Sequence, residues 1–381
     1  MAAKTIEQGD FFVVAEQSAR PLERAEFLER VQDADYILIG EGHTSRCDHE
    51  AQADILRWLA TSRPSGPAVA LEMVGVDRQP GLDLFNRGEL GAHDLSVVLD
   101  WDRSWGHEFL AYGPVFAEAA RHRLPLYAAN LPQGAARAFG RGGAEGLAPE
   151  HRKYLPETII PAGEPQREEL REVFEAHAAM MQARSEQNGT LDGPATRNGT
   201  SDKTRKPIAA TPATTKDEDV RPEEAEPEKQ MAEADTPAQD GDNPPDSEAM
   251  FERFITVQSL WDTVMAENAV RVREREGSPV VVLAGSGHVD FGWGVGLRLA
   301  HLDPEATVVL VAPWRTDPAE QTPPETMADV YFYCPLPPGT RMMGAPAPGT
   351  DQEPASEENS PADRNVAKDG PGEPEQAEDQ R

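Results

Sequence analysis

The stretch Tyr36-Ile-Leu-Ile-Gly-Glu-Gly-His43 joins a short apolar run to a turn that carries a carboxylate and an imidazole. An apolar run of this length, bounded by polar residues, predicts a buried parallel strand. Three later runs have the same form: Ala68–Leu71 before Glu72, Leu126–Ala129 before Asn130, and Val280–Ala284 before Gly285-Ser-Gly-His288. Because ligands bind beyond the carboxyl ends of strands in open α/β sheets, we expect these polar ends to form one site.

Helical patterns alternate with these strands. They cover His49–Ala60, a helix that starts at Pro80–Phe85, Val115–His122, Arg167–Ala183 and Met250–Arg275. Two more strands are predicted, Thr307–Ala312 and, as a candidate edge strand, Val330–Cys334. Alternating strands and helices with short turns predict an α/β fold: three layers, with a mainly parallel sheet, helices on both of its faces, and the site at the carboxyl ends of the strands.

Composition divides the 381 residues into a folded domain and two acidic segments. Residues 185–249 and 336–381 are rich in Pro, Glu, Asp and Thr and have few large apolar side chains. Such segments bury too little apolar surface to offset the entropy of ordering, so we expect both to be disordered. The remaining domain spans residues 36–335, with 185–249 as a surface insertion, and residues 1–35 form an N-terminal lead segment.

Charge and cysteine content limit the function classes. A formal net charge of −31 argues against nucleic acid and against anionic membrane surfaces as partners, since both select clustered Lys and Arg. No run is long enough to span a membrane, and Met1–Asp10 lacks the features of a signal peptide. Cys47 and Cys334 are the only cysteines, and two scattered thiols suit a reducing compartment. We therefore expect a cytoplasmic protein whose cysteines are not paired.

Four residues at the strand ends could act together. Glu41, His43, Glu72 and His288 offer oxygen and nitrogen ligands of the kind that bind divalent transition metals. Each also has a simpler interpretation, as a turn carboxylate that accepts backbone N–H bonds or as half of a structural ion pair. His49 and Cys47 are further candidate ligands, although His49 more simply begins a helix, and Asn130 is expected to support the site.

Aromatic residues cluster near the same motifs. Trp101, Trp105, Phe109 and Tyr112 precede a predicted helix, and Trp261 lies on the long helix Met250–Arg275. Aromatic clusters usually form core, but Trp at the entrance of a site can also line a pocket for a flat hydrophobic ligand. Both interpretations stay open at this stage.

Taken together and in order, the motifs resemble the ChaN family within the haem-binding uptake, Tiki superfamily. The matching residues are Gly40-Glu-Gly-His43 with His49 and Gln52, Leu71-Glu-Met73 with Gln79, Asp100-Trp101 with Trp105-Gly106, Tyr112-Gly-Pro114, Asn130, Phe251-Glu-Arg-Phe254 with Gln258, Trp261-Asp262, and Gly285-Ser-Gly-His288 with Gly292 and Gly294. They extend over nearly all of the predicted domain.

The resemblance implies an α/β fold and haem binding linked to iron handling, with a homodimer as the expected assembly. For such a ligand we expect Tyr112, Trp105, Tyr154 and Asn130 to be the haem-contacting residues, although the motif match itself assigns neither tyrosine as the haem ligand. Tyr112 and Tyr154 are candidate axial ligands, and His43 or His288 could serve instead. The chain departs from the exported members of the family because it shows no signal or lipidation sequence and carries long acidic segments.

Two main hypotheses follow. The first is a haem-binding protein of the ChaN kind. The second is a metal-dependent hydrolase, resembling Tiki proteases or erythromycin esterases, in which Glu41, His43 and His288 hold Mn, Co, Zn or Fe and Glu72 is the general base, so that Glu41, Glu72 and His288 form the catalytic set. A third, weaker hypothesis is an interaction protein that binds partners through its acidic segments.

Overall fold

The computed structural model describes residues 5–63, 65–189, 247–277 and 279–336. The predicted disorder of residues 190–246 and 337–381 lies outside this range. The first acidic segment is shorter than the sequence suggests, because residues 185–189 end the helix α9 (Glu164–Gly189) and residues 247–249 begin the helix α11 (Ser247–Glu276).

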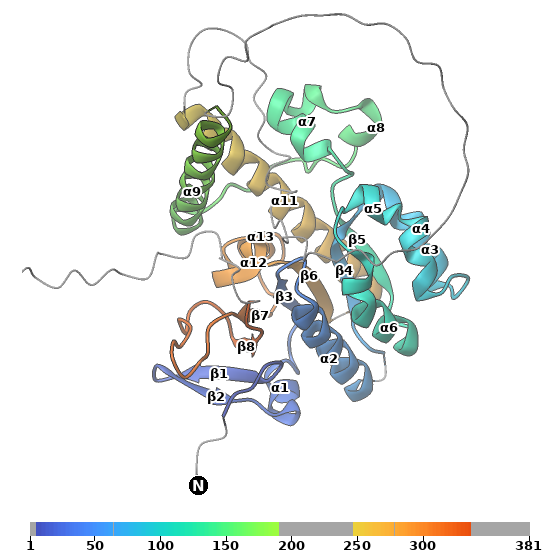
Figure 1. The fold of residues 1–381 in the computed structure, drawn as a ribbon. Helices are drawn as coiled ribbons and strands as arrows, with labels where there is room; N and C mark the ends of the chain where they lie inside the picture. The colour runs from blue at the N-terminus through green and yellow to red at the C-terminus, as the bar shows by residue number, and fades with distance from the viewer. Residues whose placement is uncertain (1–4, 64, 190–246, 278, 337–381) are drawn as a thin grey trace, which may run out of the picture. The chain divides into compact units, whose positions relative to one another are not determined.

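One sheet runs through the described part of the chain, with the strand order β2-β1-β8-β7-β3-β6-β4-β5 (Figure 1). Every neighbouring pair from β8 to β5 is parallel, and only the pairs that involve β1 are antiparallel. The strands are β1 (Phe11–Ala15), β2 (Ser18–Pro21), β3 (Tyr36–Glu41), β4 (Ala68–Gly75), β5 (Leu126–Asn130), β6 (Val280–Gly285), β7 (Val308–Trp314) and β8 (Val330–Tyr333).

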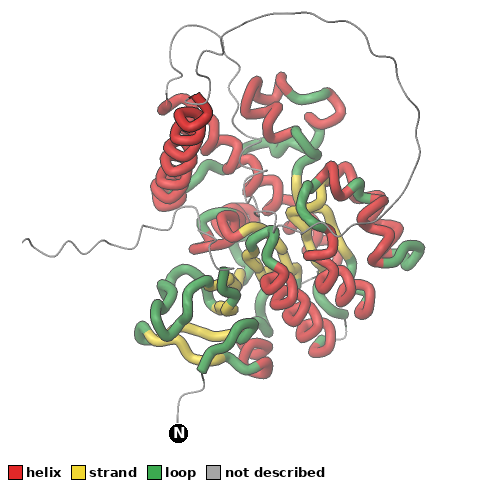
Figure 2. The backbone as a smooth tube through the Cα atoms, in the orientation of Figure 1, coloured by secondary structure: helices red, strands yellow, loops and turns green. Residues whose placement is uncertain are grey.

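Helices connect the consecutive strands from β2 to β7, and they form the outer layers of a three-layer α/β fold (Figure 2). The predicted helices are confirmed within one to three residues at most of their ends. In chain order the α-helices are α1 (Arg24–Arg30), α2 (Arg46–Ser62), α3 (Gln79–Asn86), α4 (Leu95–Val98), α5 (Trp101–Ser104), α6 (Gly113–His122), α7 (Ala135–Gly142), α8 (Pro149–Arg152), α9, α11, α12 (Ser286–Val289) and α13 (Val295–Leu302).

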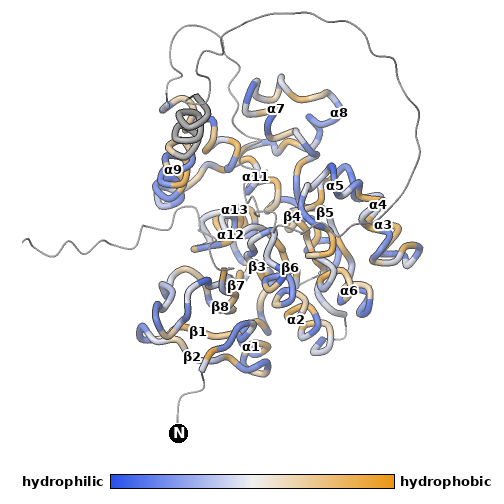
Figure 3. The backbone as a smooth tube through the Cα atoms, in the orientation of Figure 1, coloured by the Kyte–Doolittle hydropathy of each residue, from blue (hydrophilic) through white to orange (hydrophobic). Residues whose placement is uncertain are grey.

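Two hydrophobic cores lie on opposite faces of the sheet. Side chains alternate along a strand, so Ile37 and Ile39 of β3 join the core beneath α2 and α6, whereas Tyr36 and Leu38 join the core beneath α11 and α13. The hydropathy colours of Figure 3 alternate along α2 and α6, as helices with one buried face require. Burial on both faces explains why the central strands are continuously apolar.

The sheet order brings the four predicted strand ends together. β6 pairs with β3 on one side, with Glu41 opposite Gly285, and with β4 on the other, with Leu71 opposite Leu283. β5 then pairs with β4. The carboxyl ends of β3, β6, β4 and β5 are therefore consecutive along one edge of the sheet, and the expectation that their polar residues form one site stays a prediction.

The edge assignment for Val330–Cys334 is wrong. β8 lies between β7 and β1, and the sheet ends at β2. The hairpin β1–β2 that covers β8 lies in the lead segment, where the sequence shows no hairpin signal. Its turn residues Glu16 and Gln17 both have positive φ angles, 52° and 61°, in positions where Asn and Gly are usual.

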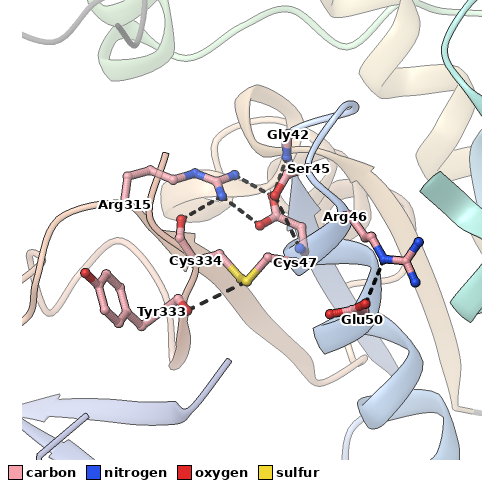
Figure 4. The surroundings of a disulfide bond; sticks show 9 residues. Gly42, Ser45, Arg46, Cys47, Glu50, Arg315, Tyr333 and Cys334 are labelled. Carbon is pink, nitrogen blue, oxygen red and sulfur yellow. Dashed lines mark hydrogen bonds and ion pairs between the residues drawn. A yellow bond between two sulfur atoms is a disulfide. The ribbon is translucent and has the colours of Figure 1, made fainter. Parts of the chain in front are cut away.

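The expectation of unpaired cysteines is also wrong. Cys47, in the first turn of α2, and Cys334, just after β8, form a disulfide with their Cα atoms 5.8 Å apart (Figure 4). The two residues are separated by 287 positions, so no local spacing pattern reveals the pair. β8 reaches Cys47 because it is an inner strand beside β7.

No helix among the described residues has both the length and the apolar character needed to cross a membrane.

The hairpin should be part of the domain's cooperative structure. Phe12 is fully buried and stacks on Tyr331 of β8, with ring centroids 5.3 Å apart. Phe12→Ala should lower the free energy of unfolding by about 3–5 kcal/mol, because it leaves a cavity in the hydrophobic cluster that Phe12 forms with Tyr331. Urea unfolding followed by circular dichroism measures the loss. Val14→Ala, at a half-buried position of the same strand, is the control, and equal small losses for both variants would show a loosely attached hairpin.

Candidate functional site

Glu41 ends β3 as a fully buried carboxylate with four neighbours. Its Oε1 atom accepts a hydrogen bond from the Tyr112 hydroxyl at 2.5 Å and lies 3.0 Å from Nδ1 of His43. Its Oε2 atom accepts a bond of 2.8 Å from the Gln52 amide. Nε2 of His49 lies 3.6 Å from Oε1. These contacts replace the water that the carboxylate loses on folding.

The charges around Glu41 favour its ionised form. Burial acts to raise the pKa of Glu41, but the His49 and His43 imidazoles oppose it and hold the pKa well below its usual range. For His43, burial acts to lower the pKa, whereas its hydrogen bond to Glu41 and the charge of Glu72 raise it above its usual value. The pair therefore consists of a carboxylate and a readily protonated imidazole.

Glu72 lies within β4, which continues to Gly75, so the predicted strand end at Leu71 is three to four residues early. The β4–β5 register shifts between Leu71 and Gly75, and this irregularity contains Glu72. Its Oε2 atom accepts a hydrogen bond of 2.6 Å from the backbone N–H of Gly285. Its Oε1 atom lies 3.5 Å from Nε2 of His288.

His288, in α12, links Glu72 to a second buried acid. Its Nδ1 atom lies 2.6 Å from Oδ1 of Asp262, a residue of α11. Asp262 also accepts a hydrogen bond from Gln166 and lies 3.4 Å from the guanidinium of Arg298. Burial acts to lower the pKa of His288, but the charges of Glu72 and Asp262 raise it to about 9. His288 is therefore an imidazolium at neutral pH, held between two carboxylates.

Gly285 lies between the Glu41–His43 pair and the Glu72–His288 pair. A Cβ atom built on Gly285 would lie 2.8 Å from Cε1 of His43 and 3.7 Å from Oε2 of Glu72. A side chain at this position would therefore displace the imidazole. The absence of a side chain lets His43 approach the end of β6 beside Glu72.

The four residues form two pairs and not a ready-made metal centre. Among the described residues, the one group of three or more Cys, His, Asp or Glu with ligand atoms within 4.8 Å of one another is Cys47, Asp48 and Cys334, and its two sulfurs are bonded to each other. A protonated imidazole cannot ligate a metal. Metal binding by Glu41, His43 and His288 therefore stays a prediction that requires rearrangement and loss of a proton.

A cavity of about 80 Å³ opens beside Glu72. It is lined by residues of β4 and the turn that follows it, of α7 and α11, and of the ends of α5 and β5 with the segments after them. These residues include Glu72, Arg78, Trp105, Asn130, Arg137 and Trp261. Trp105 also packs against His43, with ring centroids 4.9 Å apart. The lining thus combines two indole rings, two guanidinium groups, two amides and two carboxylates, since Asp77 and Gln133 also belong to it.

The predicted ligand-contacting residues fall into two groups. Trp105 and Asn130 line the cavity, although Oδ1 of Asn130 accepts a hydrogen bond from the backbone N–H of Leu131. Tyr112 is fully buried and bonded to Glu41, and Tyr154 packs in a separate cluster beneath α11. The structure does not place either tyrosine in the lining of the cavity.

Asp262 and Gln52 are site residues that the sequence reasoning did not assign a role. Asp262 lies among apolar residues of α11, where Leu260 and Val264 are buried. A carboxylate on such a face needs a buried partner, and this signal was available in the sequence. Gln52 faces Glu41 from the second turn of α2, one turn after His49, so helical spacing from the Gly40–His43 motif could have indicated it.

Comparisons with known proteins identify a matching family model and a solved structure of the same fold. A family model described as haem-binding uptake, Tiki superfamily, ChaN matches residues 27–299. A solved structure described as cofacial haem binding to ChaN of Campylobacter jejuni is 16% identical, covers 86% of this chain and 98% of its own, and has a TM-score of 0.53, which shows a shared fold. An erythromycin esterase in its open conformation, 15% identical over 77% of this chain and 73% of its own, has a TM-score of 0.36, too low to carry an argument. No curated protein matches.

The imidazolium of His288 should make stability depend on pH. Its pKa is raised from 6.5 to about 9, so its contribution is complete below pH 6.5 and is lost as the pH rises to 9. The free energy of unfolding should fall by up to about 1.4 kcal/mol per pH unit in this window. Urea unfolding of the wild-type protein and of His288→Gln at pH 6.5, 7.5 and 9 measures the difference. Parallel pH profiles for the two proteins would contradict the assignment.

Proposed function

The chain belongs to the ChaN family of the haem-binding uptake, Tiki superfamily, and from this premise we propose that it binds haem at the mouth of the cavity beside Glu72. The structural observation that carries the proposal is the contact of His43 with Trp105, which joins the Glu41–His43 pair to the cavity lining. Haem and iron handling by this protein would depend on that site.

The cavity can accept the edge of a porphyrin but is too small to enclose the whole molecule. Ligand-binding pockets usually have volumes of about 300–1,000 Å³, so a cavity of about 80 Å³ admits only part of the molecule. Trp105 and Trp261 offer apolar ring surface. Arg78 and Arg137 bring positive charge to the lining, and Arg78 also lies 3.4 Å from Asp77 and 3.6 Å from Asp100, two carboxylates with which a propionate would compete. The rest of the haem would lie outside the cavity, where a second copy of the chain could cover it. A homodimer is therefore part of the proposal.

His43 is the better axial ligand of the candidates predicted from the sequence. Bound haem supplies an iron centre that takes such a ligand from the protein. The side chain of His43 is 21% exposed, whereas Tyr112 is buried, and burial together with the Glu41 charge raises the pKa of its phenol well above the usual value. Tyr112 is better suited to hold Glu41, and Glu41 in turn orients His43 through Nδ1.

The alternative of a metal-dependent hydrolase has less support. It requires Glu41, His43 and His288 to converge on one ion, with Glu72 as the general base. The described geometry instead places His288 between Glu72 and Asp262, whose charges raise the pKa of its imidazole to about 9. Catalysis by Glu41, Glu72 and His288 stays a prediction, and the metal content of the purified protein tests it.

The cytoplasmic location also stays a prediction. The Cys47–Cys334 disulfide favours an oxidising compartment, because cytosolic thiols are kept reduced.

A haemin titration of the full chain, followed by visible absorbance, tests the proposal. The wild-type protein should show a saturable Soret shift at a fixed ratio of haem to protein. His43→Ala should weaken binding at least tenfold, because it removes the axial ligand, whereas Tyr112→Phe should change the affinity less than threefold. His93→Ala is the matched control, since the side chain of His93 is 87% exposed and His93 does not line the cavity.

A gradual, non-saturating absorbance change in the wild-type protein would contradict the proposal that it binds haem. If His43→Ala still binds haemin saturably with unchanged affinity, the protein binds haem but His43 is not the axial ligand. Light scattering on the same samples gives the mass with and without haemin, and a monomer at saturation would contradict the proposed homodimer.

Haem affinity should also rise with pH. Ligation requires a neutral imidazole, and the pKa of His43 is raised above 6.5. Binding should therefore be weaker at pH 6 than at pH 8.5, and the dependence should disappear in His43→Ala. Titrations at pH 6, 7 and 8.5 measure it. An affinity that is constant over this range would contradict ligation by His43.

A further inference from the structure

The Cys47–Cys334 disulfide lies next to the loop that carries His43. The loop, residues 42–45, joins β3 to α2, and Cys47 is the second residue of α2. Cys334 directly follows β8. Figure 4 shows the bond crossing from the beginning of the helix to the end of this strand. The disulfide therefore ties one side of the site loop to the opposite half of the sheet.

A buried ion pair forms a second tie between the same parts. Asp48 accepts a hydrogen bond of 2.7 Å from the backbone N–H of Gly42 and bonds of 2.7 and 2.5 Å from the Arg315 guanidinium. Arg315 also donates to the carbonyl oxygen of Cys334 at 3.1 Å. The ion pair and the disulfide thus meet at Cys334, as Figure 4 shows.

The two ties differ in their response to chemistry. The ion pair is permanent at neutral pH, whereas a disulfide is broken by thiols. Cys47 is half-buried and Cys334 is fully buried, so Cys47 is the more accessible half of the disulfide. Loss of the disulfide alone leaves Asp48, Arg315 and the sheet in place. The domain should then stay folded while the loop gains freedom.

We propose that Cys47–Cys334 is a reversible redox site whose reduction loosens the loop that carries His43 and thereby lowers ligand affinity at the Glu41–His43 pair. The change in the loop is independent of the ligand's identity, and only the effect on affinity rests on the proposed haem binding. The oxidised state is the one with the site assembled.

The reductant is a dithiol. One of its thiolates attacks the sulfur of Cys47 and forms a mixed disulfide, while the bond between the cysteines breaks and Cys334 leaves as a thiolate near the Arg315 guanidinium. The second thiol of the reductant then attacks the mixed disulfide and releases Cys47. The protein disulfide gains two electrons and two protons, and the dithiol loses them to become a cyclic disulfide.

Hydrogen exchange of the full chain tests the proposal. The amides of Gly42, Ser45 and Asp48 are hydrogen-bonded within the loop region and report on its opening. After treatment with dithiothreitol, exchange in peptides covering residues 40–48 should become at least fivefold faster, while peptides from α6 and β5 stay unchanged. Haemin affinity should fall at least threefold, and reoxidation should restore both values. Mass spectrometry after alkylation should count two thiols per reduced chain.

Two variants serve as controls for this experiment. Cys47→Ser/Cys334→Ser should match the reduced protein and should not respond to dithiothreitol. Arg46→Ala removes only an exposed ion pair with Glu50 beside the disulfide, and it should behave like the oxidised wild-type protein.

Three outcomes would overturn the proposal: a native protein without the disulfide, a disulfide that dithiothreitol does not reduce while the fold is intact, and reduction that leaves loop exchange unchanged. Loss of the fold on reduction would also overturn it, since the disulfide would then be a general stabilising bond. If reduction speeds exchange in the loop but neither the oxidised nor the reduced protein binds haem, the redox site is supported and the proposed function is rejected.

Discussion

The burial of three carboxylates at one edge of the sheet is the constraint on which the rest of this site depends. Glu41, Glu72 and Asp262 are almost completely removed from water, and an unpaired buried charge costs several kcal/mol. Each is therefore surrounded by donors. Glu41 has a phenol, an amide and two imidazoles, Glu72 has a backbone N–H and an imidazole, and Asp262 has an imidazole, an amide and a guanidinium.

This requirement also determines the backbone around the site. The last residue of β6 must donate its backbone N–H to Glu72 and must also leave room for the imidazole of His43. Position 285 is therefore a glycine, because any side chain there would meet His43. His288 follows three residues later in a short helix and reaches both Glu72 and Asp262. Arg298 is itself buried, and its charge compensates the acid on α11. The helices α11, α12 and α13 are thereby connected by polar bonds as well as by packing.

The opposite half of the sheet supports the site through a different set of bonds. β7 and β8 bring Arg315 and Cys334 to the beginning of α2, where they hold Asp48 and Cys47. The hairpin β1–β2 covers β8 and makes it an inner strand. The position of the His43 loop is thus set from both sides, by the buried network around Glu41 and by the ties to β8.

The sequence by itself determined the parallel strands, the helices between them and the family, because each of these rests on local periodicity or on motifs of a few residues. It placed Glu41 and Asn130 at the ends of their strands but ended β4 before Glu72, which lies inside that strand. Only the tertiary structure decided the pairing of Cys47 with Cys334, the inner position of β8 and the partner of His288. The cysteines are 287 positions apart, the hairpin turn at Glu16 and Gln17 lacks glycine, and Asp262 meets His288 only after α11 packs on the sheet. Such contacts join residues that are far apart in the sequence, and no local sequence pattern indicates them.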